Sequence, residues 1–193
     1  MAAAIDAFDN DDQAKVLVFH GEGGSFCSGF DIDEMGDKGY NTLKDASLAL
    51  ACDLRIIEDT AVMGCLGRRF GVPQSLYGAR RLTSLLGLSR ALDLLITGRL
   101  ISGEDAHQMG LAAKLTSTGT ALGEAMKLAK SISKFPQNAL IMDKLAAVNS
   151  HLNPNSEESM RDEAVMTSLL GGAIEDMKEG VKKFQKGRSL SDG

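Results

Sequence analysis

Short apolar runs in the first half of the chain are separated by polar or glycine-rich stretches, a pattern typical of buried strands and loops. The clearest run is Lys15–His20, "KVLVFH", whose β-branched and large apolar residues predict a strand. Three shorter strands are predicted at Asp53–Ile57, Ala61–Met63 and Ala112–Leu115. Gly21–Gly29, directly after the first run, predicts a loop.

Helical spacing dominates the rest of the chain. In the stretch Ser102–Asp105, "SGED", a serine precedes an acid by three residues, which predicts a capping box at the start of a helix that Gly110 ends. Gly67–Gly78 contains Pro73 and predicts irregular structure. The predicted helices are Leu43–Ala51, Ala79–Leu86, Ser89–Thr97, Gly103–Met109, Ala121–Lys134, Pro136–Asn149, Ser156–Leu170 and Ala173–Lys186. The pattern therefore predicts an α/β chain with a helical C-terminal part.

One stripe of the last predicted helix is apolar, while its lysines fall elsewhere. The stripe consists of Ile174, Met177, Val181 and Phe184.

The composition is that of an ordinary globular protein, with 193 residues, 44% apolar and 24% charged. A net charge of −5 argues against a nucleic-acid partner, which would need a basic surface. No apolar run approaches the roughly 18 residues of a membrane span, so no membrane partner is expected. The two ends show no targeting signal, which predicts a cytoplasmic protein, or a mitochondrial one if a targeting segment has been lost.

The cysteines predict neither a disulfide framework nor a zinc site, because they are odd in number and form no C-x-x-C pair. We expect Cys27, Cys52 and Cys65 to be reduced and mostly buried.

The glycine-rich stretch "GEGGSFCSGFDIDEM" at Gly21–Met35 is compatible with several kinds of site. Gly24 and Gly29 have the spacing of a phosphate-binding loop, but Phe30-Asp31 follow where that loop needs Lys and Ser or Thr. The segment "GEGGSF" supplies only half of a dinucleotide-binding fingerprint, and "FCSGF" lacks the first glycine of a nucleophile elbow. The histidines have no evident catalytic partner and are predicted to be structural: His20, His107 and His151.

A fourth interpretation fits this stretch better. Glycine before a turn residue allows a backbone N–H to point outward, and such an N–H can stabilise a negatively charged oxygen. The stretch therefore indicates an oxyanion hole.

Three segments together resemble the enoyl-CoA hydratase/isomerase (crotonase) superfamily. They are "KVLVFHGEGGSFCSGFDIDEM", "LALACDLRIIEDTAVMG" and the long run from "GRRFGVP" to "LISGEDAHQMGLAAKL", which extend from about Val16 to Leu115. The resemblance implies a ClpP/crotonase-like spiral of ββα turns over residues 1–115. It also implies a C-terminal helical region over residues 116–193 that assembles a homo-trimer or hexamer. The implied ligand is an acyl- or enoyl-CoA thioester, with coenzyme A as part of the substrate and no tightly bound cofactor.

The resemblance also assigns the oxyanion hole and the ligand path. One donor is the backbone N–H of Phe30, and Gly29 permits the turn. The neighbouring residues that match the lining of the adenine and pantetheine path are Ser28, Asp31 and Ile32. In the family, two N–H groups hold the thioester oxygen while an acid or base moves a proton.

The chain departs from the family pattern between Met35 and Leu48, where a helix and a core strand are absent and the core is expected to be shortened. The second oxyanion donor should come from a glycine-rich turn, but no glycine stands at Lys44–Ala46. Lys44 or Asp45 is the expected substitute donor, at a helix start where the dipole favours an anion.

The two hydratase glutamates are also missing, since their positions fall on Ser47 and Gly67. Asp45 and Ser47 are the remaining polar candidates near the first of them. The alternative to an active enzyme is therefore a catalytically silent protein that binds CoA or mediates oligomer contacts.

Other charged residues have both structural and functional interpretations. Asp53 is expected to pair with Arg55 or to cap a backbone N–H. Arg68 and Arg69 form either a solvated loop pair or a contact to phosphate or substrate. The lysines expected on an exposed helix face, with a coenzyme-A phosphate as the alternative contact, are Lys182, Lys183 and Lys186.

Overall fold

The computed structural model describes residues 2–27, 48–71, 73–74, 77–152, 156–169 and 172–185. The chain divides into two compact units, Phe19–Met126 and the combination of Met1–Val18 with Lys127–Gly193. In the described part of the chain, no helix has the length and apolar character needed to cross a bilayer. The core and helical regions expected over 1–115 and 116–193 remain predictions.

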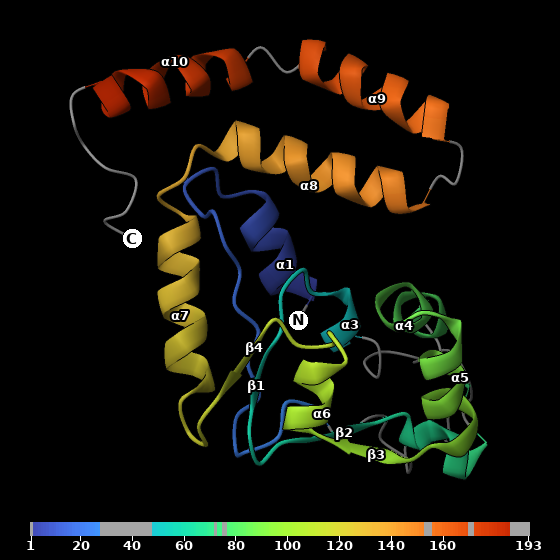
Figure 1. Cartoon of the computed structure of the whole chain (residues 1–193). Helices are drawn as coiled ribbons and strands as arrows, with labels where there is room; N and C mark the ends of the chain where they lie inside the picture. The colour runs from blue at the N-terminus through green and yellow to red at the C-terminus, as the bar shows by residue number, and fades with distance from the viewer. Residues whose placement is uncertain are drawn as a thin grey trace. The chain divides into compact units, whose positions relative to one another are not determined.

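The unit Phe19–Met126 contains two small sheets and several short helices (Figure 1). β1 (Ile56–Glu58) runs parallel to β4 (Lys114–Thr116), with Ile57 opposite Leu115. β2 (Val62–Gly64) is antiparallel to β3 (Leu100–Ser102), with Met63 opposite Ile101. The other elements in the described part of this unit are α3 (Leu48–Ala51), the 3₁₀ helix η2 (Leu66–Phe70), α4 (Gly78–Leu86), α5 (Leu88–Thr97), α6 (Gly103–Gln108) and the start of α7 (Ala121–Ile132).

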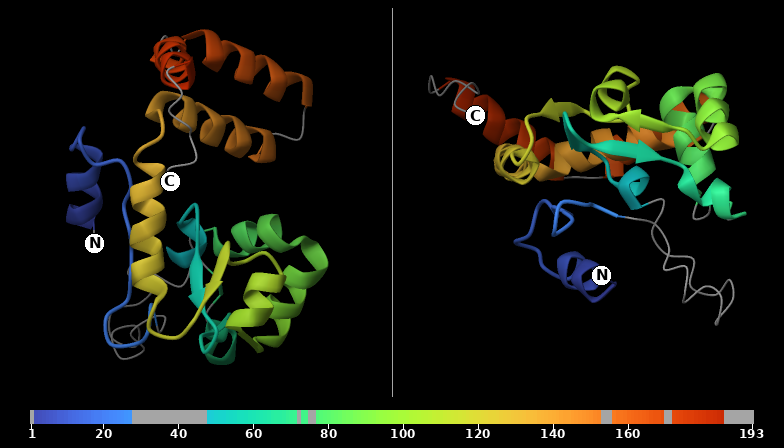
Figure 2. Two further views of the ribbon diagram at one scale, coloured as in Figure 1. Left: turned by 60° about the vertical axis from the view of Figure 1, so that its left-hand side comes forward. Right: turned by 90° about the horizontal axis from the view of Figure 1, so that it is seen from below.

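The hydrophobic core of this unit lies between the two sheets and the helix pair α4–α5, which Figure 2 shows side by side. Leu82 and Leu86 are one turn apart on α4 and face inward, as do Ala91 and Leu94 on α5. Leu94 is only 2% exposed. The other core residues are Ile57, Cys65, Ile101, Ala106, Leu111 and Ala112.

The start of α6 confirms the predicted capping box. The backbone N–H of Asp105 donates to Ser102 Oγ over 3.0 Å, and the Ser102 N–H donates to Asp105 Oδ2 over 3.3 Å. Gly103 is the residue after Ser102, and its N–H donates to the carbonyl of Ala61 over 2.8 Å. A Cβ at Gly103 would lie 2.0 Å from the carbonyl oxygen of Glu58, so the turn after β1 packs directly on this glycine.

The other unit is helical, with α1 (Ala2–Asp9), the end of α7, α8 (Gln137–Leu152), α9 (Ser156–Leu169) and α10 (Gly172–Gln185). α10 packs on the first half of α8, where the Ala139 N–H donates to Asp176 Oδ2 over 3.2 Å. α9 packs on the second half, where Asn149 Nδ2 donates to Asp162 Oδ2 over 3.1 Å. Among the residues of this unit whose side chains the structure describes, Ser159 alone is buried. These helices therefore keep much of their apolar surface uncovered.

The prediction of a strand at Lys15–His20 is wrong, because residues 14–20 have no regular structure. A strand exists only through its hydrogen bonds to a neighbouring strand, and the propensity of this run cannot supply that neighbour. The prediction at Asp53–Ile57 began too early, and β3 at Leu100–Ser102 was missed. The helix expected at Leu43–Ala51 is described only from Leu48 on, as α3. The other helices expected from periodicity are confirmed to within a few residues, including the separate α4 and α5 on either side of Gly87, whose φ is 76°.

Candidate functional site

The residues predicted for the oxyanion hole and the CoA path lie outside the described part of the chain, which has a gap at residues 28–47. They are Ser28, Gly29, Phe30, Asp31, Ile32, Lys44 and Asp45, and Ser47 lies in the same gap. Their roles stay predictions, and the candidate site is built from the segments on either side of this gap.

The loop that leads to the predicted site is formed by glycines. A Cβ at Gly21 would lie 1.9 Å from the carbonyl oxygen of Ser25, so the chain folds tightly back on itself there. Gly23 and Gly24 have φ values of 77° and 84°, the left-handed region that favours glycine. The expected loop is confirmed over its described residues. Cys27 at its end is exposed, contrary to the expectation that the cysteines are mostly buried.

On the other side of the gap, Arg55 holds the end of α3. Its Nη1 donates to the carbonyls of Ala49, over 3.3 Å, and of Cys52, over 2.5 Å. Its Nε donates to the Leu111 carbonyl over 2.5 Å. A cation at the last carbonyls of a helix is favourable, because it satisfies groups that have no partner within the helix. These three hydrogen bonds of Arg55 go to backbone carbonyls. The two roles expected for Asp53, a pair with Arg55 or a cap on a backbone N–H, stay predictions.

Burial shifts the pKa values of Arg55 and Cys52. Burial lowers the pKa of Arg55, an effect that Cys52 and Asp53 oppose. Burial raises the pKa of the Cys52 thiol, which the charge of Arg55 opposes. Cys52 therefore remains a thiol at neutral pH and donates weakly to the Leu48 carbonyl over 3.5 Å. Arg55 and Cys52 therefore hold the carbonyl groups of α3 and of the residue after it.

The position of the second family glutamate, Gly67, lies within η2. The expectation of irregular structure at Gly67–Gly78 is therefore wrong at its start. The first turn of η2 holds no acid, and the charged side chains of η2 are those of Arg68 and Arg69. Arg69 Nη2 donates to the Gly98 carbonyl over 3.4 Å, which ties η2 to the end of α5.

Two adjacent carboxylates at the end of β1 were missed by the sequence interpretation. Glu58 Oε1 accepts the N–H of Ala121 at the start of α7 over 3.1 Å. Asp59 Oδ1 accepts the Thr118 hydroxyl over 2.7 Å and the Thr60 N–H over 2.8 Å. Backbone N–H groups of Gly119 and Ala121 lower the pKa of Glu58, and the Thr118 hydroxyl lowers that of Asp59. A carboxylate with a lowered pKa is a poor general acid. Glu58 caps the start of α7, while Asp59 holds Thr118 in the turn before it.

The Glu58 cap predicts a pH dependence of stability. A carboxylate whose pKa is lower in the folded than in the unfolded state stabilises the fold above the unfolded pKa, about 4.3 for Glu, and loses that effect as the pH falls through the folded pKa. We expect Glu58→Gln to be less stable to urea than the unchanged protein at pH 7, with the difference shrinking as the pH falls below about 4.5. Glu22→Gln, at an exposed position in the glycine loop, is the control. An equal difference at pH 7 and pH 3 would contradict the cap.

The structure describes all three histidines and Lys182. His107 Nδ1 lies 3.0 Å from the Ala112 carbonyl, as a structural histidine would. His20 is exposed, and His151 lies in the last turn of α8, where a loop was expected. Lys182 lies exposed on α10, as predicted. In the part of the chain that the structure describes, no three His, Cys, Asp or Glu side chains gather in a possible metal site.

The chain belongs to the enoyl-CoA hydratase/isomerase family, whose model matches residues 45–190. A protein of Rhizobium meliloti (strain 1021), named as a probable enoyl-CoA hydratase, is 30% identical over 211 residues, which cover 94% of this chain and 81% of the relative. A mitochondrial relative of Dictyostelium discoideum with the same designation is 26% identical over 97% of this chain and 77% of its own length.

The solved structures confirm the crotonase-like fold that the sequence motifs predicted. The enoyl-CoA hydratase subunit I of Geobacillus kaustophilus HTA426 superposes with a TM-score of 0.85 at 30% identity, covering 97% of this chain and 83% of that one. Enoyl-CoA hydratase EchA1 of Mycobacterium marinum gives a TM-score of 0.88 at 25% identity.

The match to the Rhizobium protein is longer than this chain, 211 against 193 residues. The relative must therefore have residues inside the matched range that have no counterpart here. An internal segment that is absent from this chain would leave such unmatched residues in the relative.

Proposed function

We propose that this protein binds the thioester of an acyl- or enoyl-CoA and stabilises the enolate of its carbonyl group through backbone N–H donors. The observation that carries the proposal is the family match over residues 45–190. By resemblance, Phe30 after Gly29 donates one N–H, and Lys44 or Asp45 donates the second at the start of the helix predicted over Leu43–Ala51. The path of the CoA portion follows Ser28, Asp31 and Ile32. Coenzyme A enters as part of the substrate, with no tightly bound cofactor.

A second candidate function is a catalytically silent CoA-binding protein. The observation that favours it is Gly67 in η2, because a glycine stands where the family's second glutamate activates water or delivers a proton. Ser47 replaces the first glutamate. A positioned acid or base commonly contributes about 10²–10⁴-fold in rate, so water addition without either group would be slow.

We further propose that the helical unit packs on other copies in a homo-trimer or hexamer. This proposal is supported by the apolar side chains exposed on α8 and α10, which are Ile141, Leu145, Val148, Ile174, Met177 and Val181. Helices gain most of their stability from burying such faces. Sedimentation equilibrium tests the proposal, and a monomer at every concentration would contradict it.

Turnover and binding of crotonyl-CoA, measured on the same preparation, separate the two functions. The loss of the conjugated thioester is followed by absorbance, and binding is measured by calorimetry with free coenzyme A as the comparison. We expect crotonyl-CoA to bind, with turnover about 10²-fold or more below the typical 1–10³ s⁻¹ of enzymes. Turnover within 1–10³ s⁻¹ would contradict the catalytically silent function. If the folded protein does not bind crotonyl-CoA, both candidate functions are contradicted.

A further inference from the structure

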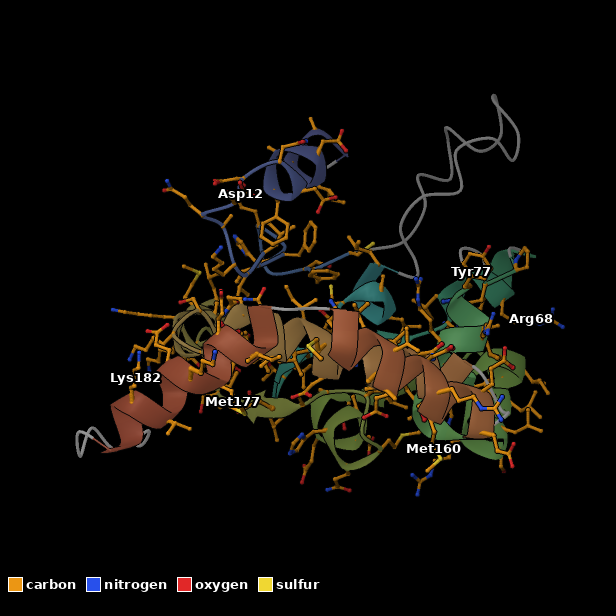
Figure 3. The ribbon with its side chains drawn as sticks, turned by 90° about the horizontal axis from the view of Figure 1, so that it is seen from above. Asp12, Arg68, Tyr77, Met160, Met177 and Lys182 are labelled. Carbon is orange, nitrogen blue, oxygen red and sulfur yellow. The ribbon has the colours of Figure 1, made fainter. Side chains whose placement is uncertain are left out.

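Arg55 is half-buried, unlike several other arginines of the unit that contains the two sheets. Arg80 and Arg90 are exposed, and so is Arg68, whose side chain Figure 3 shows extending outward from the ribbon. Removing a guanidinium from water costs free energy unless protein acceptors replace the hydrogen bonds to water. The position of Arg55 therefore depends on the acceptors that surround it.

These acceptors come from two segments that are distant in sequence. Arg55 Nη1 donates to the carbonyls of Ala49 and Cys52 at the end of α3, over 3.3 and 2.5 Å. Its Nε donates to the carbonyl of Leu111, between α6 and β4, over 2.5 Å. The carbonyl of Arg55 also accepts the Ala113 N–H over 2.8 Å. One side chain thus attaches the end of α3 to the connection between α6 and β4.

This connection is part of the hydrophobic core, whereas α3 is not. Leu111 is 2% exposed and Ala112 is 3% exposed. None of the four residues of α3 is buried, so its side chains hold it less firmly than those of α4 and α5 hold their helices. The bond between Arg55 and Leu111 therefore transfers the fixed position of the core backbone to α3.

A helix cap alone does not require this arrangement. Any cation that reaches the last carbonyls of α3 would satisfy them and would complement the helix dipole. A lysine carries its donors on one nitrogen, whereas a guanidinium donates from separate nitrogens in a planar fork. The fork of Arg55 holds α3 and the Leu111 backbone at the same time, and so determines where α3 lies.

We propose that Arg55 is a positioning residue for the second oxyanion donor, a role that rests on the proposed function. That donor is expected at Lys44 or Asp45, four or three residues before α3 begins at Leu48. An oxyanion donor acts only at hydrogen-bond distance from the carbonyl oxygen, and a displacement of about 1 Å can cost about 10²-fold in rate. Arg55 holds the helix at the opposite end from this donor and acts through the helix, without touching the thioester.

The carbonyl band of bound crotonyl-CoA, measured by infrared difference spectroscopy on the full chain, tests this role. Arg55→Met removes every donor of the guanidinium, whereas Arg55→Lys keeps a cation for the carbonyls of α3 and loses the bond to Leu111. We expect the band to shift to lower frequency in the unchanged protein and to shift less in both variants. Affinity for free coenzyme A, measured by calorimetry, should stay the same, because free coenzyme A has no thioester carbonyl.

Glu58→Gln is the matched control, because it weakens the cap of α7 in the same unit without touching α3. It should lower the stability to urea and keep the full shift of the band. Circular dichroism establishes that each variant is folded, and Arg55→Lys, the milder change, decides the test if Arg55→Met does not fold.

The outcomes separate this role from the proposed function. A full shift in the folded Arg55 variants would overturn the positioning role and leave the proposed function intact. An equally reduced shift in Glu58→Gln would also overturn it, because the effect would then follow stability alone. Equal losses of affinity for free coenzyme A and crotonyl-CoA would assign the effect of Arg55 to the binding path instead. An unshifted band in the unchanged protein would contradict the proposed oxyanion hole itself, and with it the role of Arg55.

Discussion

Replacing Gly103 with alanine is expected to destabilise the protein by about 3 kcal/mol, a large part of the 5–15 kcal/mol that holds a typical domain together. The new Cβ would lie 2.0 Å from the carbonyl oxygen of Glu58 and 3.1 Å from its carbonyl carbon. Both atoms belong to the backbone, so no side-chain rotation relieves the overlap. The start of α6 must move away from β1, and the Gly103 N–H then loses its 2.8 Å hydrogen bond to Ala61.

Urea unfolding of Gly103→Ala and Gly123→Ala measures this effect against a matched control. Gly123 lies inside α7, and a Cβ there would have no neighbour within 4 Å. Alanine is a better helix former than glycine, so Gly123→Ala should raise the free energy of unfolding by about 0.5–1 kcal/mol. A Gly103→Ala protein as stable as the unchanged one would show that α6 does not pack on the turn after β1 as described.

Local sequence signals predicted the features of this fold that depend on neighbours in sequence. The capping box needs only Ser102 and Asp105, three residues apart, and periodicity over a dozen residues is enough to identify α7. β3 is too short, at three residues, for an alternating pattern to be recognised.

Features that depend on distant contacts could not be predicted in this way. The carboxylate of Glu58 caps a helix that starts 63 residues later, and Arg55 donates to Leu111 across 56 residues. The reverse error occurred at Lys15–His20, where strand propensity was strong and the structure shows no strand. In each case a hydrogen-bonding partner that is distant in sequence determines the structure, and the local sequence does not identify that partner.

In the candidate site, too, local motifs could be recognised from the sequence, whereas the distances between remote residues could not. The three motif segments together were sufficient to predict the family, which the match over residues 45–190 establishes. The departures at Ser47 and Gly67 were also visible, because they are substitutions at motif positions. The geometry of the two oxyanion donors depends on how Phe30 and Lys44 or Asp45 approach each other, which no motif specifies.

Replacing Phe30 with proline is the sharpest test of the proposed oxyanion hole. Proline has no backbone N–H, so Phe30→Pro removes the proposed donor, whereas Phe30→Ala removes the ring and keeps the N–H. Removal of one oxyanion donor costs about 10²–10³-fold in rate in an active enzyme, equivalent to about 3–4 kcal/mol at the carbonyl oxygen. The same donor also polarises the carbonyl of a bound thioester when no turnover follows.

The thioester carbonyl band of bound crotonyl-CoA, measured by infrared difference spectroscopy, reports this polarisation with or without catalysis. We expect the band to shift to lower frequency in the unchanged protein and in Phe30→Ala, and to stay near its position in solution in Phe30→Pro. Far-UV circular dichroism confirms that both variants fold. A full shift in folded Phe30→Pro would exclude the Phe30 N–H as a donor, whereas loss of the shift in both variants would assign the effect to the ring. Because bound crotonyl-CoA is observed directly, a silent protein that keeps its oxyanion hole is distinguished from one that has lost it.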